Sequence, residues 1–248
     1  MTDLLPVTDL WLCPEPVSLD PDLADAFADM LNETEQLRWQ RFKYPQDRDR
    51  FLLVRALVRS VLGTCLDIPP AQVRFRANAW GKPELDTGVH DGSSLQFNLS
   101  HTRGLAVLAL AEGVPLGVDV EDLHRRVEWL ALAQRYFARD EVADLQALPP
   151  AAQRGHFFSL WTLKEAYVKA LGLGLRIPLA DFSFSLSADK EPLLHHPDSF
   201  LSPKHWQFDS MQVEEHFRLA LAVQGGASGP RAIRLHKGLP LQGYTLVE

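Results

Sequence analysis

Apolar residues along this chain follow a helical spacing first and strand spacings afterwards. Between Asp49 and Leu62 they recur three and four positions apart in two offset series, which is typical of a helix packed on two sides. We expect the helix to end at Gly63, because glycine is the residue that most often closes a helix. Short apolar runs between turn residues then predict strands. These runs cover residues 73–77, 95–99 and 104–111.

Two later segments combine apolar and acidic positions. In Gly117-Val118-Asp119-Val120-Glu121 the valines alternate with carboxylates, which predicts a strand whose Asp119 and Glu121 share one face. Trp161, Glu165 and Lys169 are four residues apart, which places them on one stripe of a predicted helix. Three carboxylates with a neighbouring ammonium suit a Mg²⁺–phosphate site, since Mg²⁺ prefers oxygen ligands and keeps positions for substrate phosphates.

The second half of the chain repeats the plan of the first. Three segments recur at a nearly constant offset: 56–60 with 166–170, Gly63 with Gly172, and 68–75 with 177–184. This repeat predicts an α+β fold, a pseudo-twofold pair of similar α+β subdomains with the active site in the cleft between them. We expect the halves to be residues 1–117 and 118–248, the second including a C-terminal extension. In this alignment Glu165 corresponds to Arg55.

Composition narrows the class of protein. A chain of 248 residues with 46% hydrophobic content can bury a large core. Its formal net charge of −7 argues against a general nucleic-acid binder, which usually carries a basic balance. Cys13 and Cys65 have neither metal-site nor disulfide spacing, and we expect both to be buried free thiols in a reducing compartment.

Targeting and surface segments give weaker signals. No secretory signal and no apolar run of membrane length is visible, so we expect a cytoplasmic protein that binds neither membrane nor nucleic acid. Residues 185–203 contain His195, His196 and several prolines, and we expect a long surface loop there.

The two acidic segments belong to a longer series of motifs. Gly117 to Glu121, followed by Trp161-Thr162-Leu163-Lys164-Glu165-Ala166-Tyr167-Val168-Lys169, resembles the signature pair of phosphopantetheinyl transferases. The likeness is to the larger, surfactin-synthetase-activating type, in which one chain holds two similar halves. Further elements occur in the family's order: Arg41 to Arg50, Gly81-Lys82-Pro83, Phe97-Asn98-Leu99-Ser100-His101, and Tyr136-Phe137 with Glu141.

This resemblance implies an activity. Its members transfer the 4′-phosphopantetheine arm of coenzyme A to a serine of an apo acyl or peptidyl carrier protein and release adenosine 3′,5′-bisphosphate. The resemblance implies Asp119, Glu121 and Glu165 as Mg²⁺ ligands, with Lys169 and Lys164 offsetting the surplus negative charge. We expect Glu165 and Lys169 to be catalytic. Glu165 is the candidate base for the serine proton, directly or through a metal-bound water, and these alternatives stay open.

The resemblance also assigns residues to coenzyme A. His101, beside Ser100, is implied to bind the 3′-phosphate, and the Gly81-Lys82-Pro83 turn to border the adenine and its phosphates. Two arginines correspond to family cations near the phosphates. The full coenzyme A set is Arg38, Arg50, Gly81, Lys82, Pro83, Ser100, His101, Lys164 and Lys169.

Two other functions fit parts of the pattern. An Mg²⁺-dependent nuclease or phosphodiesterase would use the same acidic residues and lysine, although the net charge disfavours polynucleotide binding. A non-catalytic module that binds coenzyme A or a carrier protein would have little use for three carboxylates. The internal repeat favours a monomer that already contains the paired architecture.

Overall fold

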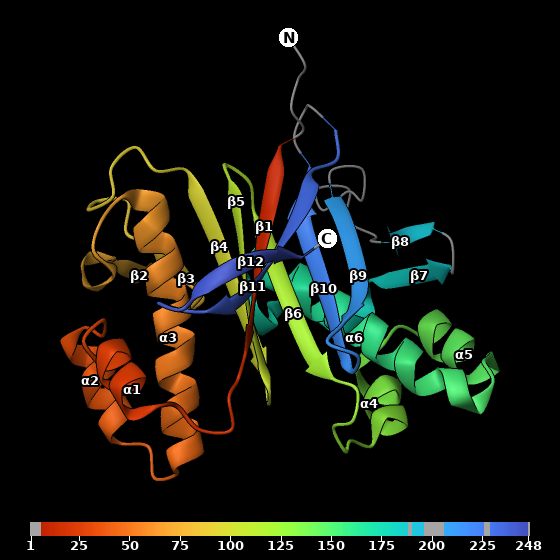
Figure 1. The fold of residues 1–248 in the computed structure, drawn as a ribbon. Coiled ribbons are helices and arrows are strands. Elements are labelled where there is room, and N and C mark those ends of the chain that lie inside the picture. Colours follow the sequence, from red (N-terminus) through yellow and green to blue (C-terminus); the bar gives the residue numbers. More distant parts are fainter. Residues whose placement is uncertain (1–5, 188–189, 196–205, 226–228, 248) are drawn as a thin grey trace.

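Two halves lie side by side in the computed structural model, each with one long helix packed on strands (Figure 1). The structure describes residues 6–187, 190–195, 206–225 and 229–247. Its α-helices are α1 (Pro21–Ala28), α2 (Glu33–Gln40), α3 (Pro45–Leu66), α4 (Trp129–Tyr136), α5 (Arg139–Ala147) and α6 (Pro150–Leu171). Its 3₁₀ helices are η1 (Pro70–Gln72), η2 (Gly174–Arg176) and η3 (Leu179–Asp181). Its strands are β1 (Val7–Pro14), β2 (Phe75–Ala77), β3 (Pro83–Leu85), β4 (Leu95–Thr102), β5 (Leu105–Glu112), β6 (Leu116–Asp122), β7 (Ser183–Ser187), β8 (Lys190–His195), β9 (Trp206–Val213), β10 (Phe217–Gln224), β11 (Ala232–Leu239) and β12 (Gly243–Val247).

Most strands belong to two sheets that pack face to face. The first has the order β12-β11-β1-β5-β4, and the second has the order β6-β10-β9. Helix α3 covers the outer face of the first sheet and α6 the outer face of the second, and alternate residues of both sheets form the layer between them. The C-terminal strands β11 and β12 join the sheet of the first half, where β11 runs parallel to β1.

The two long helices begin and end alike. Each spans 22 residues, starts with a proline and ends before a residue in the left-handed conformation, Asp67 (φ 54°) in one and Gly172 (φ 66°) in the other. The expected helix end at Gly63 is wrong, because Gly63 lies inside α3. A Cβ there would lie 2.8 Å from Ile68 O, so the glycine allows the chain to return closely against the helix.

Both halves bury a cation at the same place in the long helix. Arg59 of α3 pairs with Glu35, and Lys164 of α6 pairs with Glu141. Each glutamate also accepts a backbone N–H at the start of its own short helix. Each cation donates to two carbonyl oxygens around the 3₁₀ helix that follows. These equivalent contacts show that the two halves share one plan.

The same contacts correct the register of the repeat. Because Arg59 is equivalent to Lys164, Glu165 corresponds to Ser60 and not to Arg55. The two halves differ after the helix: three residues separate α3 from η1, whereas seven residues, including η2, separate α6 from η3. The offset read from the sequence therefore holds for η1 and η3, which follow the long helices, but it does not hold within the helices themselves.

Some local expectations also change. Residues 183–187 and 190–195 form the paired strands β7 and β8, so the loop expected at 185–203 is wrong over these positions, and its part at 196–203 lies outside the described residues. Cys13 is buried, but Cys65 is exposed. Among the described helices, none has the length and apolar character required to pass through a membrane.

Candidate active site

Side chains of β4 accept hydrogen bonds from backbone N–H groups along one edge of β6. Since β10 pairs with the other edge, alternate residues of β6 direct their backbone groups toward the first half. Asn98 Oδ1 and Ser100 Oγ accept hydrogen bonds from the N–H groups of Val118 and Val120, at 2.9 and 3.3 Å. This junction places β6 beside the end of β4. Sequence reasoning gave Asn98 no role, although its alternation with Ser100 on one strand could have indicated it.

Asp119 and Lys169 form the centre of the site. Asp119 Oδ1 accepts hydrogen bonds from Lys169 Nζ at 2.7 Å and from Ser100 Oγ at 2.8 Å. Lys169 Nζ also donates to Ser100 Oγ at 3.0 Å and to Val118 O at 3.2 Å. These bonds connect β4, β6 and α6, so the site lies where the two halves meet. Ser100 is thus held by protein groups here.

Two further carboxylates lie close to Asp119. Burial raises the pKa of Glu121, and the neighbouring Asp119 raises it further, while Arg125 opposes the shift. Arg125 Nη1 donates to Glu121 Oε1 at 2.8 Å. Burial raises the pKa of Glu165 as well, and the negative charges of Asp119 and Glu121 add to that rise. The three carboxylates act on one another electrostatically and create a place that favours positive charge.

The carboxylates of the site are the donors that a divalent metal ion would use. Within the described residues, no three His, Cys, Asp or Glu side chains already form a group that could hold one. The predicted convergence of Asp119, Glu121 and Glu165 on a single ion is therefore not preformed, because Lys169 and Arg125 bind two of these carboxylates. Asp119 Oδ2, however, is a buried oxygen without a hydrogen-bond partner. A buried lone carboxylate oxygen beside two other carboxylates fits a divalent cation.

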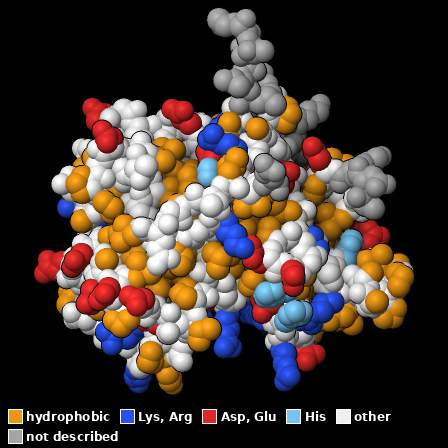
Figure 2. Space-filling model, viewed as in Figure 1, with side chains coloured by type: hydrophobic (Ala, Val, Ile, Leu, Met, Phe, Trp, Pro, Cys, Tyr) orange, Lys and Arg blue, Asp and Glu red, His pale blue; other side chains and the backbone are white. Residues whose placement is uncertain are grey.

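A basic group lies on the other face of β4. His101 alternates with Ser100, so its side chain points away from β6. Desolvation lowers the pKa of His101, and the positive charges of Arg50 and Lys169 lower it further. Glu15 holds this region together, since it pairs with Arg50 Nε at 3.0 Å and accepts the Gly104 N–H at 2.8 Å. Sequence reasoning missed Glu15, which no motif marks. Figure 2 shows Lys and Arg side chains along the lower edge of the molecule, where α3 begins and β6 ends.

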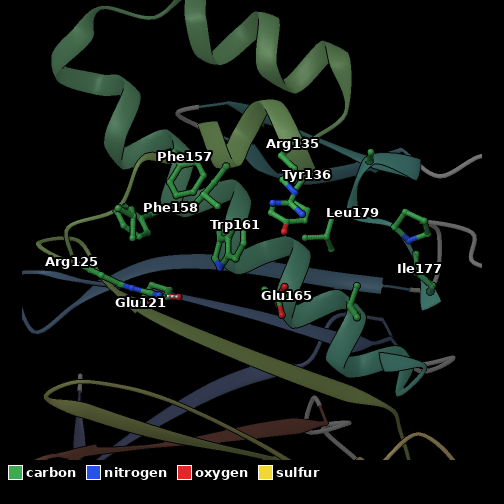
Figure 3. Close-up of a pocket in the computed structure, with 15 residues that line it drawn as sticks. Glu121, Arg125, Arg135, Tyr136, Phe157, Phe158, Trp161, Glu165, Ile177 and Leu179 are labelled. Carbon is green, nitrogen blue, oxygen red and sulfur yellow. Dashed lines mark hydrogen bonds and ion pairs between the residues drawn. The ribbon is translucent and has the colours of Figure 1, made fainter. Parts of the chain in front are cut away.

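A cavity of about 590 Å³ opens beside the carboxylates. Figure 3 shows Glu165 of α6 and Glu121 of β6 at one side of it, with the aromatic side chains of Trp161, Tyr136 and Phe157 along its wall. Trp161 contacts Tyr136 and Phe157 and also lines this cavity. The site therefore combines a charged end with an apolar chamber.

Two 4′-phosphopantetheinyl transferases are similar in sequence to this chain along most of its length. It is 33% identical over 224 residues to the 4′-phosphopantetheinyl transferase HetI of Nostoc sp., covering 90% of each chain. It is 31% identical over 199 residues to the 4′-phosphopantetheinyl transferase Sfp of Bacillus subtilis, covering 80% of this chain and 84% of that protein. The chain belongs to the 4′-phosphopantetheinyl transferase superfamily. The superfamily model matches residues 115–222, and a model of the transferase N-terminal part matches residues 20–113.

Lys164 of this transferase does not reach the site. Its side chain is fully buried in the second half, where it pairs with Glu141 at 2.7 Å and donates to Leu179 O and Phe182 O. The expectation that Lys164 binds coenzyme A or offsets charge at the metal is therefore wrong. The physical reason is that its ammonium already has partners in the core, as Arg59 has in the first half.

The remaining predicted residues lie apart from the centre. Arg38 of α2 stacks on the ring of Phe51, which Arg55 contacts as well, and no contact ties Arg38 to His101 among the described residues. Gly81 is exposed in the loop between β2 and β3, and Pro83 is exposed at the first position of β3. Lys82, between them, extends across to the second half. The assignments of these residues to coenzyme A stay predictions.

Proposed function

We propose that this protein transfers the 4′-phosphopantetheine arm of coenzyme A to a serine hydroxyl of an apo acyl or peptidyl carrier protein. The other product is adenosine 3′,5′-bisphosphate, and the reaction depends on Mg²⁺. The observation that carries the proposal is the meeting of Asp119, Glu121, Glu165 and Lys169 beside an apolar cavity, which is lined by residues of the second half. Family membership supports the same reaction.

The charges of the site suit a pyrophosphate. Asp119, Glu121 and Glu165 would hold Mg²⁺, which when bound neutralises charge on the pyrophosphate oxygens as the bond breaks. Lys169 can move from Asp119 to a phosphate oxygen without leaving its place on α6. His101 and Arg50 supply donors on the other face of β4, and we assign them to the 3′-phosphate end of coenzyme A.

The cavity suits the rest of the substrate. The pantetheine arm is a long, mostly uncharged chain, and a chamber with aromatic walls that begins at Glu165 can receive it. The serine of the carrier must then approach from the open side, near the carboxylates. We assign the acceptance of its proton to Glu165, either directly or through a water molecule.

Mass spectrometry tests the proposal directly. The purified protein is incubated with coenzyme A, Mg²⁺ and several apo acyl and peptidyl carriers, and the intact mass of each carrier is read. We expect at least one carrier to gain a single phosphopantetheine group, and we expect chelation of the metal to prevent the gain. Carriers in which the acceptor serine is replaced by alanine provide the control, and they should gain no mass. Absence of modification on every carrier would contradict the proposal.

His101→Ala is expected to weaken coenzyme A binding by about tenfold, because one charge-assisted hydrogen bond to the 3′-phosphate is lost. Binding of 3′-dephospho-coenzyme A should change much less, and calorimetric titration of both ligands measures the difference. His195→Ala, an exposed histidine on β8, is the matched control. Equal weakening of the two ligands would reject the assignment of His101 to the 3′-phosphate.

A further inference from the structure

The loop between β2 and β3 crosses from the first half to the end of α6. Lys82 Nζ donates to Leu116 O at 3.1 Å and to Ala170 O at 3.5 Å. Asn78 Nδ2 donates to Gly172 O at 3.1 Å. The Arg176 guanidinium lies 4.0 Å from the centre of the Trp80 ring. The loop therefore docks on the residues that the second half has inserted after its long helix.

The partners of Lys82 are groups that need a donor. Ala170 lies in the last turn of α6, where carbonyl oxygens have no partners within the helix and the helix dipole is negative. Leu116 O lies on the same edge of β6 as Val118 O, which accepts from Lys169. An ammonium that binds both carbonyls thus joins the helix end to the strand.

The loop is built to present Lys82. Asn78 Oδ1 accepts the N–H groups of Trp80 and Lys82, at 2.8 and 3.0 Å. The left-handed conformation of Gly81 (φ 84°) completes the turn between them. Asn78 therefore has two roles: its side-chain oxygen shapes the turn, and its side-chain nitrogen binds the end of α6.

Between the two lysines the helix and the strand touch directly. A Cβ at Gly117 would lie 2.1 Å from Ala166 O and 2.4 Å from Ala170 N, so β6 passes against the backbone of α6 here. Lys169 binds β6 on the site side of this contact, and Lys82 binds it on the other side. The contact is fixed at both ends.

We infer that Lys82 is a positioning residue, which sets the place of α6 relative to β6 and so the distance between Glu165 and Asp119. The inference rests on the proposed function for its catalytic meaning, but the contacts themselves lie within the protein. It differs from the expectation that the Lys82 side chain binds coenzyme A, because its ammonium is held by carbonyls of the second half.

Four variants test this role. Lys82→Met removes the donors, Lys82→Arg keeps a cation, and Asn78→Ala removes the neighbouring tie. Arg76→Met, on β2 of the same hairpin, is the matched control, because Arg76 is exposed and its nearest carboxylate oxygen is 3.6 Å away. For Lys82→Met we expect kcat to fall about 10- to 100-fold and KM for coenzyme A to change less than about threefold. Lys82→Arg should retain more activity, and Asn78→Ala should show a smaller loss of the same kind.

Hydrogen exchange separates this inference from the proposed function. Amides of residues 114–122 and 161–172 should exchange faster in Lys82→Met than in wild type or Arg76→Met, and this readout needs no substrate. If the wild type modifies no carrier, the proposed function fails. Hydrogen exchange would still show whether Lys82 holds α6 against β6. Unchanged exchange and kcat, with a raised KM for coenzyme A, would overturn the inference in favour of a direct ligand.

Protonation of Lys82 gives another readout. Burial lowers its pKa to about 8, and the charge of Glu84 on β3 opposes the shift. Between that value and the ordinary 10.5, the unfolded chain holds the proton and the folded chain does not, so the contribution of Lys82 to stability rises with pH. The Tm difference between wild type and Lys82→Met should therefore grow from about pH 7.5 to about pH 9.5. A flat difference would contradict this prediction, because it would show that burial does not lower the pKa of Lys82.

Discussion

Asp119→Asn is expected to lower kcat/KM for phosphopantetheine transfer by roughly 10³-fold, because the site loses its central negative charge. Asparagine retains an oxygen that can accept from Lys169 and Ser100, as Asp119 Oδ1 does. It cannot offer a charged oxygen in place of the buried, unpartnered Oδ2. The variant should fold normally and fail in its reaction.

Single-turnover transfer to an apo carrier, read by intact mass over a range of Mg²⁺ concentrations, measures this effect. We expect the half-saturating Mg²⁺ concentration to rise along with the loss of rate, since the lost charge is part of the cation site. Asp122→Asn, at the end of the same strand, is the control, because asparagine can still accept the His124 N–H there. A wild-type transfer rate in Asp119→Asn would contradict the proposal that the acidic residues hold the catalytic metal ion.

Alternation and motif order in the sequence were sufficient to predict the strand of Asp119 and the helix of Glu165. Both predictions are confirmed, as is the α+β pair of similar halves. They succeeded because the periods of strands and helices are properties of the local chain. The resemblance implied that Lys169 serves the site of Asp119, but it gave Ser100 only as a coenzyme A ligand, and the bonds that join Ser100 to both residues appear only in the structure.

Contacts between distant segments explain what the sequence could not predict. Lys164 and Lys169 stand on the same helix in similar surroundings of sequence, yet one is buried with Glu141 and the other faces the site. Because they are five positions apart, their side chains point about 140° away from each other around the helix, and Glu141 of α5 packs on the side of Lys164. Gly63 seemed a helix end because glycines commonly are, but it serves a close contact with Ile68. The pairing of β11 with β1 depends on residues more than two hundred positions apart, which no local pattern records.

Gly117→Ala is expected to destabilise the protein by about 3 kcal/mol or more, because the added methyl group would overlap backbone atoms of α6. The overlap involves Ala166 O and Ala170 N, at 2.1 and 2.4 Å, and neither can turn aside as a side-chain end could. For a chain of this size the loss corresponds to a fall in Tm of roughly 6–12 °C. Transfer should slow about 10²-fold in the folded fraction, since β6 must move away from α6 and carry Asp119 with it.

Gly155→Ala is the matched control on the same helix, because nothing lies within 4 Å of its added Cβ. It should raise stability by about 0.5–1 kcal/mol, since alanine favours a helix more than glycine does. Thermal unfolding of both variants, with transfer rates at 20 °C or another temperature below either transition, separates the two effects. If Gly117→Ala melted like wild type and kept its rate, α6 and β6 would not be in the close contact that holds Glu165 beside Asp119. The first residue of the acidic motif would then have no structural reason to be glycine.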